Sequence, residues 1–455
     1  MSDPSTESSP SSQQPLLSGR KGMFQALAIR DFKLLWISSI AASFAMQMQM
    51  VARGWLIYDM TESPMALTWV MLSFMLPSLL FSLVGGVIAD RLQKKNIMLG
   101  SQTLNTGATI LLAYIVYSGN VTFSHFIYFG LFNGTVLSFS MPARTSVIPE
   151  IVGREYVVNA MALQSATFNL SRILGPTLAG IFIAIFASGD TSSTTGVGIV
   201  FYVIAILYAI SVMMTWMLNY EGKPQRSTES SMLEDVKEGF QYMREERVIL
   251  GLLIIGFIPM TFGFAATSLL PVFNKEVISG GPDDLGYLLT AMGGGALFGS
   301  LVLAKLGDMR HKGRILFYAA YFWSVSLLAF ALSSTLWAAL FFGVFTGLCG
   351  SVMGSLNMSV VQLAVRPEIR GRVMAIMMML HGLMPFGIIP IGWLAEVINI
   401  QVALAVSAVL LAITTVATGY YYPELLKIDK GHQEEDISRT AVTGSRNTSA
   451  GSRNE

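Results

Sequence analysis

The chain has 455 residues, of which 53% are hydrophobic and only 13% are charged, and its mean hydropathy is +0.58. An ordinary soluble domain is roughly 25% charged, so this composition excludes a water-soluble globular protein. The net charge of +1 argues against nucleic acid as a partner. The single cysteine, Cys349, excludes an intramolecular disulfide framework and any multi-cysteine metal site, and we expect no metal.

Long apolar stretches recur along the whole chain. A helix needs about 20 apolar residues to cross a bilayer, and helices satisfy their backbone hydrogen bonds internally, so we expect helices rather than strands. The first 33 residues are polar and the first apolar run is too long for a signal peptide, so no cleaved leader is expected. The sequence predicts an all-α membrane protein with twelve transmembrane helices, near 34–58, 66–88, 97–118, 122–141, 158–187, 196–218, 248–273, 284–306, 314–334, 336–363, 373–396 and 401–422.

These spans divide the chain into two bundles of six helices, separated by a charged stretch and flanked by polar tails. Within these tails, residues 1–19 and 431–455 are rich in Ser, Gln, Thr, Asn and charge, which is typical of disorder. The expected parts are an N-terminal tail (1–33), a first bundle (34–218), a linker (219–247), a second bundle (248–422) and a C-terminal tail (423–455).

The basic residues indicate the orientation, because lysine and arginine favour the cytoplasmic side of membrane proteins. With the N-terminus inside, 26 of the 29 basic residues fall on the cytoplasmic side, Lys275 falls outside, and Arg53 and Arg172 fall within spans. We therefore expect a multi-pass protein of the cell (inner or plasma) membrane with both termini in the cytoplasm.

The two bundles are copies of one unit. The hexapeptide PEIVGR at 149–154 reappears as PEIRGR at 367–372, an offset of 218 residues, and the same offset aligns ADRLQKKNI (89–97) with GDMRHKGRI (307–315). Six helices per unit give both copies the same orientation. Parallel repeats joined by a cytoplasmic linker are typical of transporters, with the substrate path between them.

The segment GVIADRLQKKNIM resembles the loop signature after the second helix of the major facilitator superfamily. Five residues match it, and Gln93 stands where the signature has glycine. The resemblance implies that the Asp90-type residue locks the two halves together when the protein opens outward, although the same residues also fit an ordinary positively charged loop. The expected gating residues are Gly86, Asp90, Arg91, Lys94, Lys95 and, in the second repeat, Asp308.

The segment GPTLAG resembles a motif of the antiporter (efflux) branch of that superfamily, and its residues Gly175, Pro176 and Gly180 are expected to allow close helix packing. An ordinary small-residue packing face is the alternative. The segments RDFKLLW and PARTSVIPEIVGREYVVNAMALQ resemble the subgroup of siderophore (enterobactin) and macrolide exporters, over about residues 28–422. The resemblance implies proton coupling, but the family's fourth helix often carries an arginine, and FIYFGLFNGTVLSFS has none.

An arginine, Arg53, and two amides, Gln47 and Gln49, interrupt the first span. A charge at bilayer depth is costly and usually faces the bundle interior or a water-filled cavity. Gln49 and Arg53 share one helix face with Met46 and Met50, which favours a cavity wall. Arg53 also lies about five residues from the expected outer end of the span, so snorkelling to the interface is the alternative.

Two further residues are candidates for the substrate or coupling path. Arg172 lies near the middle of the fifth span, on one face with Ser165, Asn169 and Pro176, and either meets water and substrate or is a buried structural tie. His381 lies in the eleventh span; its side chain titrates near physiological pH and is a possible protonation site, or a packing residue.

All 28 acidic residues fall in tails, loops or helix ends. The charges within spans are arginines, which favours an anionic or neutral polar substrate over a cation as a hypothesis. A P-loop and a nucleophile–base motif are both missing, so we expect neither ATP-driven pumping nor an enzyme, and no cofactor.

The sequence thus predicts a monomeric secondary transporter in the lipid bilayer that exports a small molecule (a drug, siderophore or other metabolite) by alternating access. The resemblance makes the proton the expected coupling ion. The alternatives are an importer of a small polar solute and a transporter-like receptor that binds without transport.

Overall fold

The structure is a computed structural model that describes residues 25–187, 194–220, 241–306, 311–365 and 383–428, together with Ile369, Val373, Ile376, Met377 and Leu380. A few side chains within these ranges, chiefly 82–91 of the second helix, are left out of the description. The described residues form helices and short turns, and no strand occurs among them. The expectation of an all-helical protein is confirmed.

The first bundle consists of a 3₁₀ turn and five helices: η1 (Gln25–Ala28), α1 (Arg30–Thr61), α2 (Pro64–Arg91), α3 (Lys94–Tyr117), α4 (Phe123–Phe186) and α5 (Thr194–Trp216). The second bundle consists of α7 (Arg247–Ser268), α8 (Leu270–Phe273), the π turn η2 (Asn274–Ile278), α9 (Pro282–Leu306), α10 (Lys312–Ala331), α11 (Leu336–Ala364), α13 (Met384–Val397), α14 (Ile400–Tyr421) and the 3₁₀ turn η3 (Pro423–Lys427).

Nine helices in the described part of the chain are long and apolar enough to cross a membrane. The expected spans at 97–118 and 122–141 are helical but are not among the nine. Both carry polar side chains such as Gln102 and Asn133 toward an internal cavity, which lowers their mean hydropathy. The expected span at 373–396 is described as a continuous helix only from Met384 onward.

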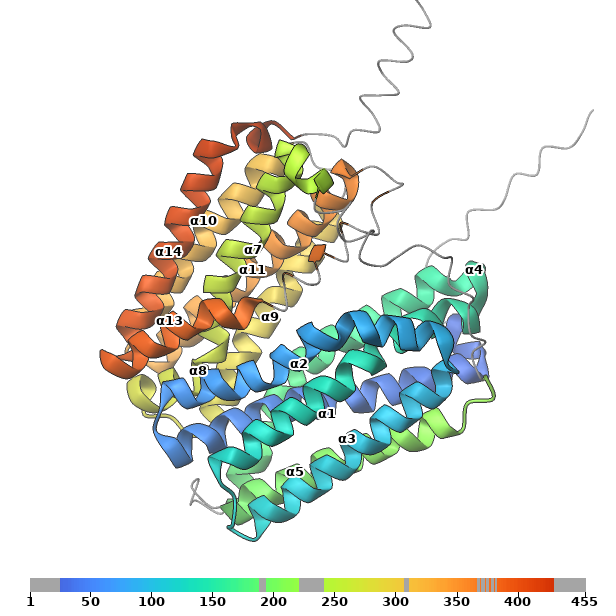
Figure 1. Cartoon of the computed structure of the whole chain (residues 1–455). Helices are drawn as coiled ribbons and strands as arrows, with labels where there is room; N and C mark the ends of the chain where they lie inside the picture. The colour runs from blue at the N-terminus through green and yellow to red at the C-terminus, as the bar shows by residue number, and fades with distance from the viewer. Residues whose placement is uncertain are drawn as a thin grey trace, which may run out of the picture.

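Helix α4 differs most from the expectation. It runs for 64 residues and contains a bend at Gly153, where φ is 70° and ψ is 171°. This left-handed φ suits glycine, which lacks a Cβ atom. The segment before the bend continues beyond Pro142, so the expected end of that span at residue 141 was about eleven residues too early. The bend therefore divides α4 into two antiparallel-running segments, which pack in the same bundle (Figure 1).

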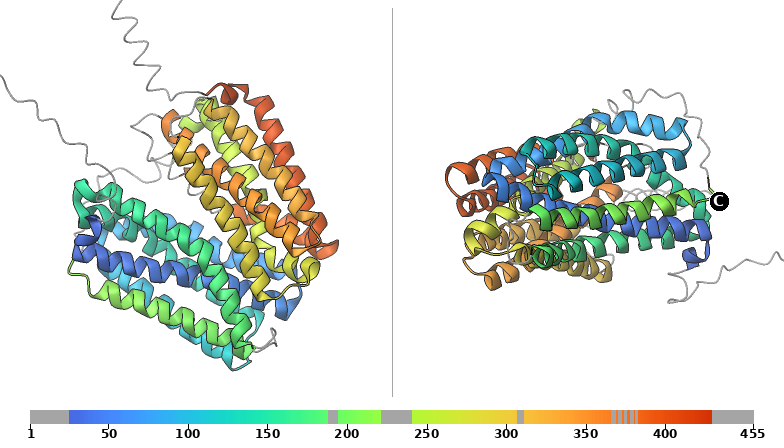
Figure 2. Two further views of the ribbon diagram at one scale, coloured as in Figure 1. Left: turned by 180° about the vertical axis from the view of Figure 1, so that it is seen from behind. Right: turned by 90° about the horizontal axis from the view of Figure 1, so that it is seen from below.

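The two bundles meet at one end and diverge toward the other, and both side views show this V shape (Figures 1 and 2). We call the end that contains α8 the closed end and the opposite end, which contains the bend of α4, the open end. Within the first bundle α1 packs against α4 and α5, and within the second α9 and α10 pack against α11. Between the bundles the contacts are α4 with α9, α2 with α13 and α1 with α8.

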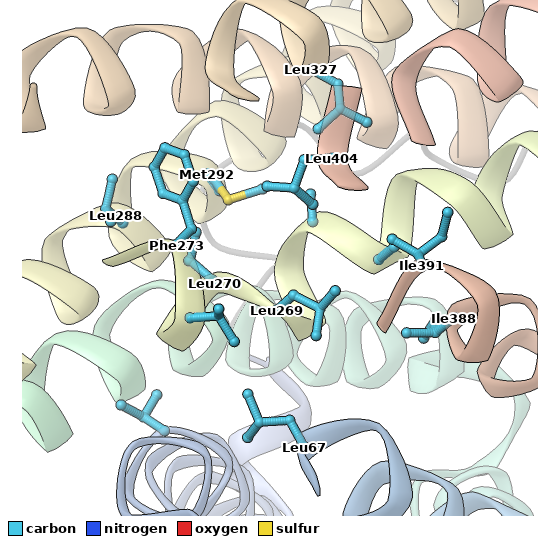
Figure 3. Packing of buried hydrophobic residues seen from close by; sticks show 14 of the residues in the cluster. Leu67, Leu269, Leu270, Phe273, Leu288, Met292, Leu327, Ile388, Ile391 and Leu404 are labelled. Carbon is cyan, nitrogen blue, oxygen red and sulfur yellow. The ribbon is translucent and has the colours of Figure 1, made fainter. Parts of the chain in front are cut away.

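One apolar cluster spans both bundles at the closed end. Leu67 of α2 lies opposite Leu269, Leu270 and Ile388 of the second bundle (Figure 3), and all four are buried. Burial of a leucine side chain stabilises by roughly 1.5–3 kcal/mol in water, whereas in lipid close packing contributes most of the association. A second, smaller cluster around Phe32, Leu35 and Val147 lies within the first bundle only.

Candidate functional site

A cavity of about 940 Å³ lies between the two bundles, lined by residues of both. Its volume is in the upper part of the range of roughly 300–1,000 Å³ that is usual for small-molecule sites. The apolar cluster of Figure 3 joins the two bundles at the closed end, and the bundles diverge toward the open end. The cavity therefore lies between two bundles that contact each other at one end and separate toward the other.

Helix α1 contributes the stripe that the sequence predicts. Met46, Gln49, Met50 and Arg53 all line the cavity. The guanidinium carbon of Arg53 lies 5.7 Å from the centre of the Phe74 ring, within cation–π range. Helix α1 continues to Thr61, which places Arg53 deeper than expected. The Arg53 side chain therefore lies in the cavity and not at the lipid interface.

A polar network surrounds Gln49. Its amide nitrogen lies 3.5 Å from the Thr109 hydroxyl, and its amide oxygen accepts a hydrogen bond of 3.4 Å from the Tyr208 hydroxyl. Tyr208 also lies within electrostatic range of Arg53 and Arg144. These contacts hold neutral polar groups beside the two guanidiniums.

Arg144 is a cavity residue that the sequence did not predict. We expected it in a cytoplasmic loop, but it lies inside α4 and lines the cavity, so the expectation of a fourth helix without arginine was wrong. Its Nη2 atom lies 3.4 Å from the Ser38 hydroxyl, and its Nε atom is buried and has no hydrogen-bond partner in the described part of the chain. The helical spacing of Asn133, Ser140 and Arg144 could have indicated it, since all three fall on one helix face and line the cavity. A single proline need not end a membrane helix.

Arg172 also lines the cavity, from the segment of α4 after the bend. Its predicted neighbour Pro176 lines the cavity too, whereas Asn169 donates to the Ser165 carbonyl within its own helix and is not part of the lining. His381 lies outside the described residues. The cavity thus brings together Gln49, Arg53 and Arg172 of the predicted path and adds Arg144.

The two walls of the cavity differ in chemistry. The wall from the first bundle carries all three arginines. The wall from the second bundle is mostly thioether, aromatic and small, with Phe257, Met260, Phe264, Met292 and Met358 among its residues. No acidic side chain occurs among the described lining residues.

Polar contacts join the bundles at the closed end. The Tyr58 hydroxyl donates a 2.5 Å hydrogen bond to Glu276, and the Lys275 ammonium forms a 2.6 Å ion pair with Asp59. Both contacts connect the end of α1 to η2. None of these four residues was predicted as functional.

A third polar contact connects α2 with α13. One carboxylate oxygen of Glu396 accepts hydrogen bonds from the Ser63 hydroxyl at 2.7 Å and from the Met65 backbone N–H at 3.1 Å. Because α2 and α13 belong to different bundles, the acceptor carboxylate holds the first turn of α2 against the second bundle.

The segment GPTLAG packs against α9 of the other bundle. A Cβ atom on Gly180 would collide with the Pro282 carbonyl oxygen, and one on Gly286 would lie 3.2 Å from the Pro176 carbonyl oxygen. The Thr290 hydroxyl donates a 3.2 Å hydrogen bond to the Ile173 carbonyl. Gly175 instead faces α1, with its Cβ position 2.7 Å from Gln47 Cβ.

Two of the expected gating residues lie in contacts within the first bundle. Lys94 is buried and forms an ion pair with Glu150 of α4, which also accepts a hydrogen bond from the Tyr220 hydroxyl. The Lys95 ammonium donates to the Leu218 carbonyl. Burial and the Glu150 carboxylate raise the pKa of Tyr220 above its ordinary value.

The side chains of the other expected gating residues lie outside the description. Gly86, Asp90 and Arg91 lie at the end of α2, where side chains are outside the description, and Asp308 lies outside the described residues.

A model of the transmembrane secretion effector family matches residues 21–442. The chain belongs to this family of the major facilitator superfamily. The resemblance of its motifs to that superfamily is confirmed, and the chain is a multi-pass membrane transport protein.

Several transporters are similar to the chain in sequence. The staphyloferrin A transporter of Staphylococcus aureus is 24% identical over 357 residues, covering 77% of this chain and 86% of that protein. Macrolide efflux protein A of Streptococcus pyogenes is 21% identical over 378 residues, covering 81% of this chain and 90% of that protein. The enterobactin exporter EntS of Shigella boydii is 24% identical over 237 residues, covering 51% and 53%.

Among solved structures, the nucleoside transporter NupG superposes with a TM-score of 0.67 at 14% identity, covering 88% of this chain and all of that one. An auto-inhibited POT family peptide transporter superposes with a TM-score of 0.67 at 13% identity, covering 88% and 98%. At these identities the likeness concerns the fold.

Proposed function

We propose that the protein is a secondary transporter that exports a small molecule by alternating access. The observation that carries the proposal is the cavity of about 940 Å³, lined by both bundles and sealed at one end by contacts between them. Rocking of the bundles about this cavity exposes it to one side of the membrane at a time. The relatives named for macrolide efflux and enterobactin export support the outward direction.

The proposed layout has twelve spans in two parallel halves, 34–218 and 248–422, joined by the linker 219–247. The bend at Gly153 supports it, because the two segments of α4 then count as separate spans. The tails 1–33 and 423–455 lie in the cytoplasm. The basic residues Lys94, Lys95, Lys312 and Arg314 all lie at the open end. Their position supports the proposal that this end faces the cytoplasm and that this conformation is the inward-open state.

The proposed energy source is the proton gradient, with the protein acting as a monomer. The described cavity lining contains no carboxylate, whereas Asp59, Glu276 and Glu396 take part in contacts between the bundles at the closed end. Carboxylates at that end are therefore the proposed proton-binding groups. In the outward-open state the Asp90-type loop is the proposed lock at the opposite end, with Lys94 and Lys95 released from Glu150 and Leu218.

The test is transport in proteoliposomes and retention in cells that lack the protein. An exporter gives higher retention of its substrate in the deletion strain and movement against a gradient in proteoliposomes when a pH difference is imposed. Lower retention in the deletion strain supports the importer instead. Saturable binding with no movement across the liposome membrane supports the receptor.

A further inference from the structure

The charge of the cavity is confined to one wall. Arg53, Arg144 and Arg172 are the charged residues among its described lining, and all three belong to the first bundle. Within the described part of the chain, neither of the two ion pairs involves them. A charge at bilayer depth normally meets an opposite charge or water, because its desolvation costs several kcal/mol. The cavity therefore holds cationic donors whose anion is not supplied by the described residues.

Arg144 is the clearest of the three. Its Nε–H is buried and has no partner among the described groups, and its Nη2 contact to Ser38 is long and is made to a neutral hydroxyl. A buried donor without an acceptor costs about 1–3 kcal/mol, and more when it is charged. A guanidinium presents its N–H groups in a planar fork that matches a carboxylate. A ligand with a hydrogen-bond acceptor that enters the cavity can accept a hydrogen bond from the Arg144 Nε–H.

The opposite wall recognises a different part of the ligand. Phe257, Met260, Phe264 and Met292 form an apolar, polarizable surface on the second bundle. Methionine side chains adapt to irregular apolar shapes. Close to them, the indole Nε1–H of Trp323 is buried without a partner among the described residues and lines the same cavity. This wall suits a hydrocarbon or aromatic body that carries few polar groups.

We infer that the cavity binds an amphiphilic organic anion, with its acidic group at Arg53 and Arg144 and its apolar body against the second bundle. The inference rests on the proposed function, since it names the substrate class of that same cavity. A cationic amphiphile fits the apolar wall but meets three like charges, and like-charge contact is destabilising at this depth. A small hydrophilic anion fits the arginines but leaves the apolar wall without contact.

The experiment measures binding to the full-length protein in lipid nanodiscs, with empty nanodiscs as the blank. The probe is tritiated naphthalene-2-acetate. The competitors share parts of it: its neutral primary amide, the naphthylmethyl-trimethylammonium cation, and acetate, which lacks the apolar body. We expect the amide to compete at least about tenfold more weakly than the acid, which is about 1.4 kcal/mol. Acetate and the cation are expected to compete more weakly still.

Variants then locate the acidic group. Arg53→Gln and Arg144→Gln are each expected to weaken binding of the acid about tenfold and to leave the affinity for the amide unchanged. Arg314→Gln is the matched control, because Arg314 is exposed at the start of α10 and is not part of the lining. A merely structural role of the arginines would reduce the affinities for the acid and the amide together.

Three results overturn the inference: no saturable binding of naphthalene-2-acetate, equal competition by the cation, or unchanged acid binding in both folded arginine variants. The proposed function fails separately. If the acid binds as expected but is not moved across proteoliposome membranes, transport is wrong and the ligand class stands. If proteoliposomes transport the cation and not the acid, transport stands and the ligand class is wrong.

Discussion

Tyr58 and Glu276 form a 2.5 Å hydrogen bond between the bundles and are separated by 218 residues, the offset of the internal repeat. The bond joins the last turns of α1 to the π turn η2 of the other bundle. The neighbouring ion pair between Asp59 and Lys275 spans the same contact. This contact seals the end of the cavity that we propose faces outward.

Loss of this ion pair should favour opening of the closed end. Lys275→Ala removes the partner of Asp59, and a partly exposed pair contributes up to about 1 kcal/mol, or about fivefold in an equilibrium constant. The measurement is the labelling rate of Thr267→Cys, a cavity position near the closed end, by an impermeant thiol reagent added outside. We expect the rate to rise up to about fivefold, in a Cys349→Ser background that removes the native thiol.

Lys305→Ala is the control for this measurement, because Lys305 is exposed near the end of α9, at the open end. An unchanged labelling rate in Lys275→Ala, or an equal rise in Lys305→Ala, would contradict a role of the closed-end ion pair.

The contact of GPTLAG with α9 should depend on the absence of a side chain. Gly180→Ala places a methyl group against the Pro282 carbonyl oxygen. Because the obstacle is backbone, α4 and α9 must move apart to accommodate the methyl group. We expect faster outside labelling of Thr267→Cys and weaker transport. Gly294→Ala is the matched control on α9, because a Cβ atom there meets nothing within 4 Å. Equal behaviour of the two variants would indicate that close packing at this site does not control closure.

Glu150 should be more important for stability than the sequence suggests. Its carboxylate is the partner of the buried Lys94 ammonium, so Glu150→Ala leaves a buried charge unpaired, which costs about 3–5 kcal/mol. Lys94→Met in the Glu150→Gln background removes both charges and should restore most of the loss. Thermal unfolding in detergent measures this difference. A double variant that is no more stable than Glu150→Ala would be evidence against the pair.

Tyr220 should make the protein less stable in alkaline solution. Its folded-state pKa is raised by burial and by the Glu150 carboxylate, whereas an unfolded tyrosine titrates near 10. Below pH 10 both states are protonated and the contribution is complete; above it the unfolded state loses its proton first, so stability falls as pH rises. Tyr220→Phe should reduce this fall between pH 9 and about 11 in thermal unfolding. An identical pH profile in both proteins would refute the linkage.

The sequence predicts the helical class and much of the first wall of the cavity, because these depend on local composition and helical periodicity. Arg144 was counted among the cytoplasmic basic residues because the expected span ended at residue 141, whereas α4 continues through Pro142. Prolines are tolerated in membrane helices when neighbours satisfy the freed backbone group. The closed-end residues were missed for another reason. Asp59 and Glu276 look like ordinary helix-end and loop charges until the two bundles are placed together.

The most direct measurement of the central claim is a pair of distances in one protein. Spin labels at Asn96 and Arg314, both exposed at the open end, report the width of the open end. Labels at Asn120 and Ser334, both exposed at the closed end, report the width of the closed end. The distance between the two labels of each pair is measured by pulsed electron–electron double resonance in nanodiscs at neutral and acidic pH. The protein carries Cys349→Ser, so that the native thiol is not labelled. We predict that the open-end distance shortens in the population in which the closed-end distance lengthens. Two distances that lengthen together, or that stay fixed while substrate is transported, would contradict alternating access about this cavity.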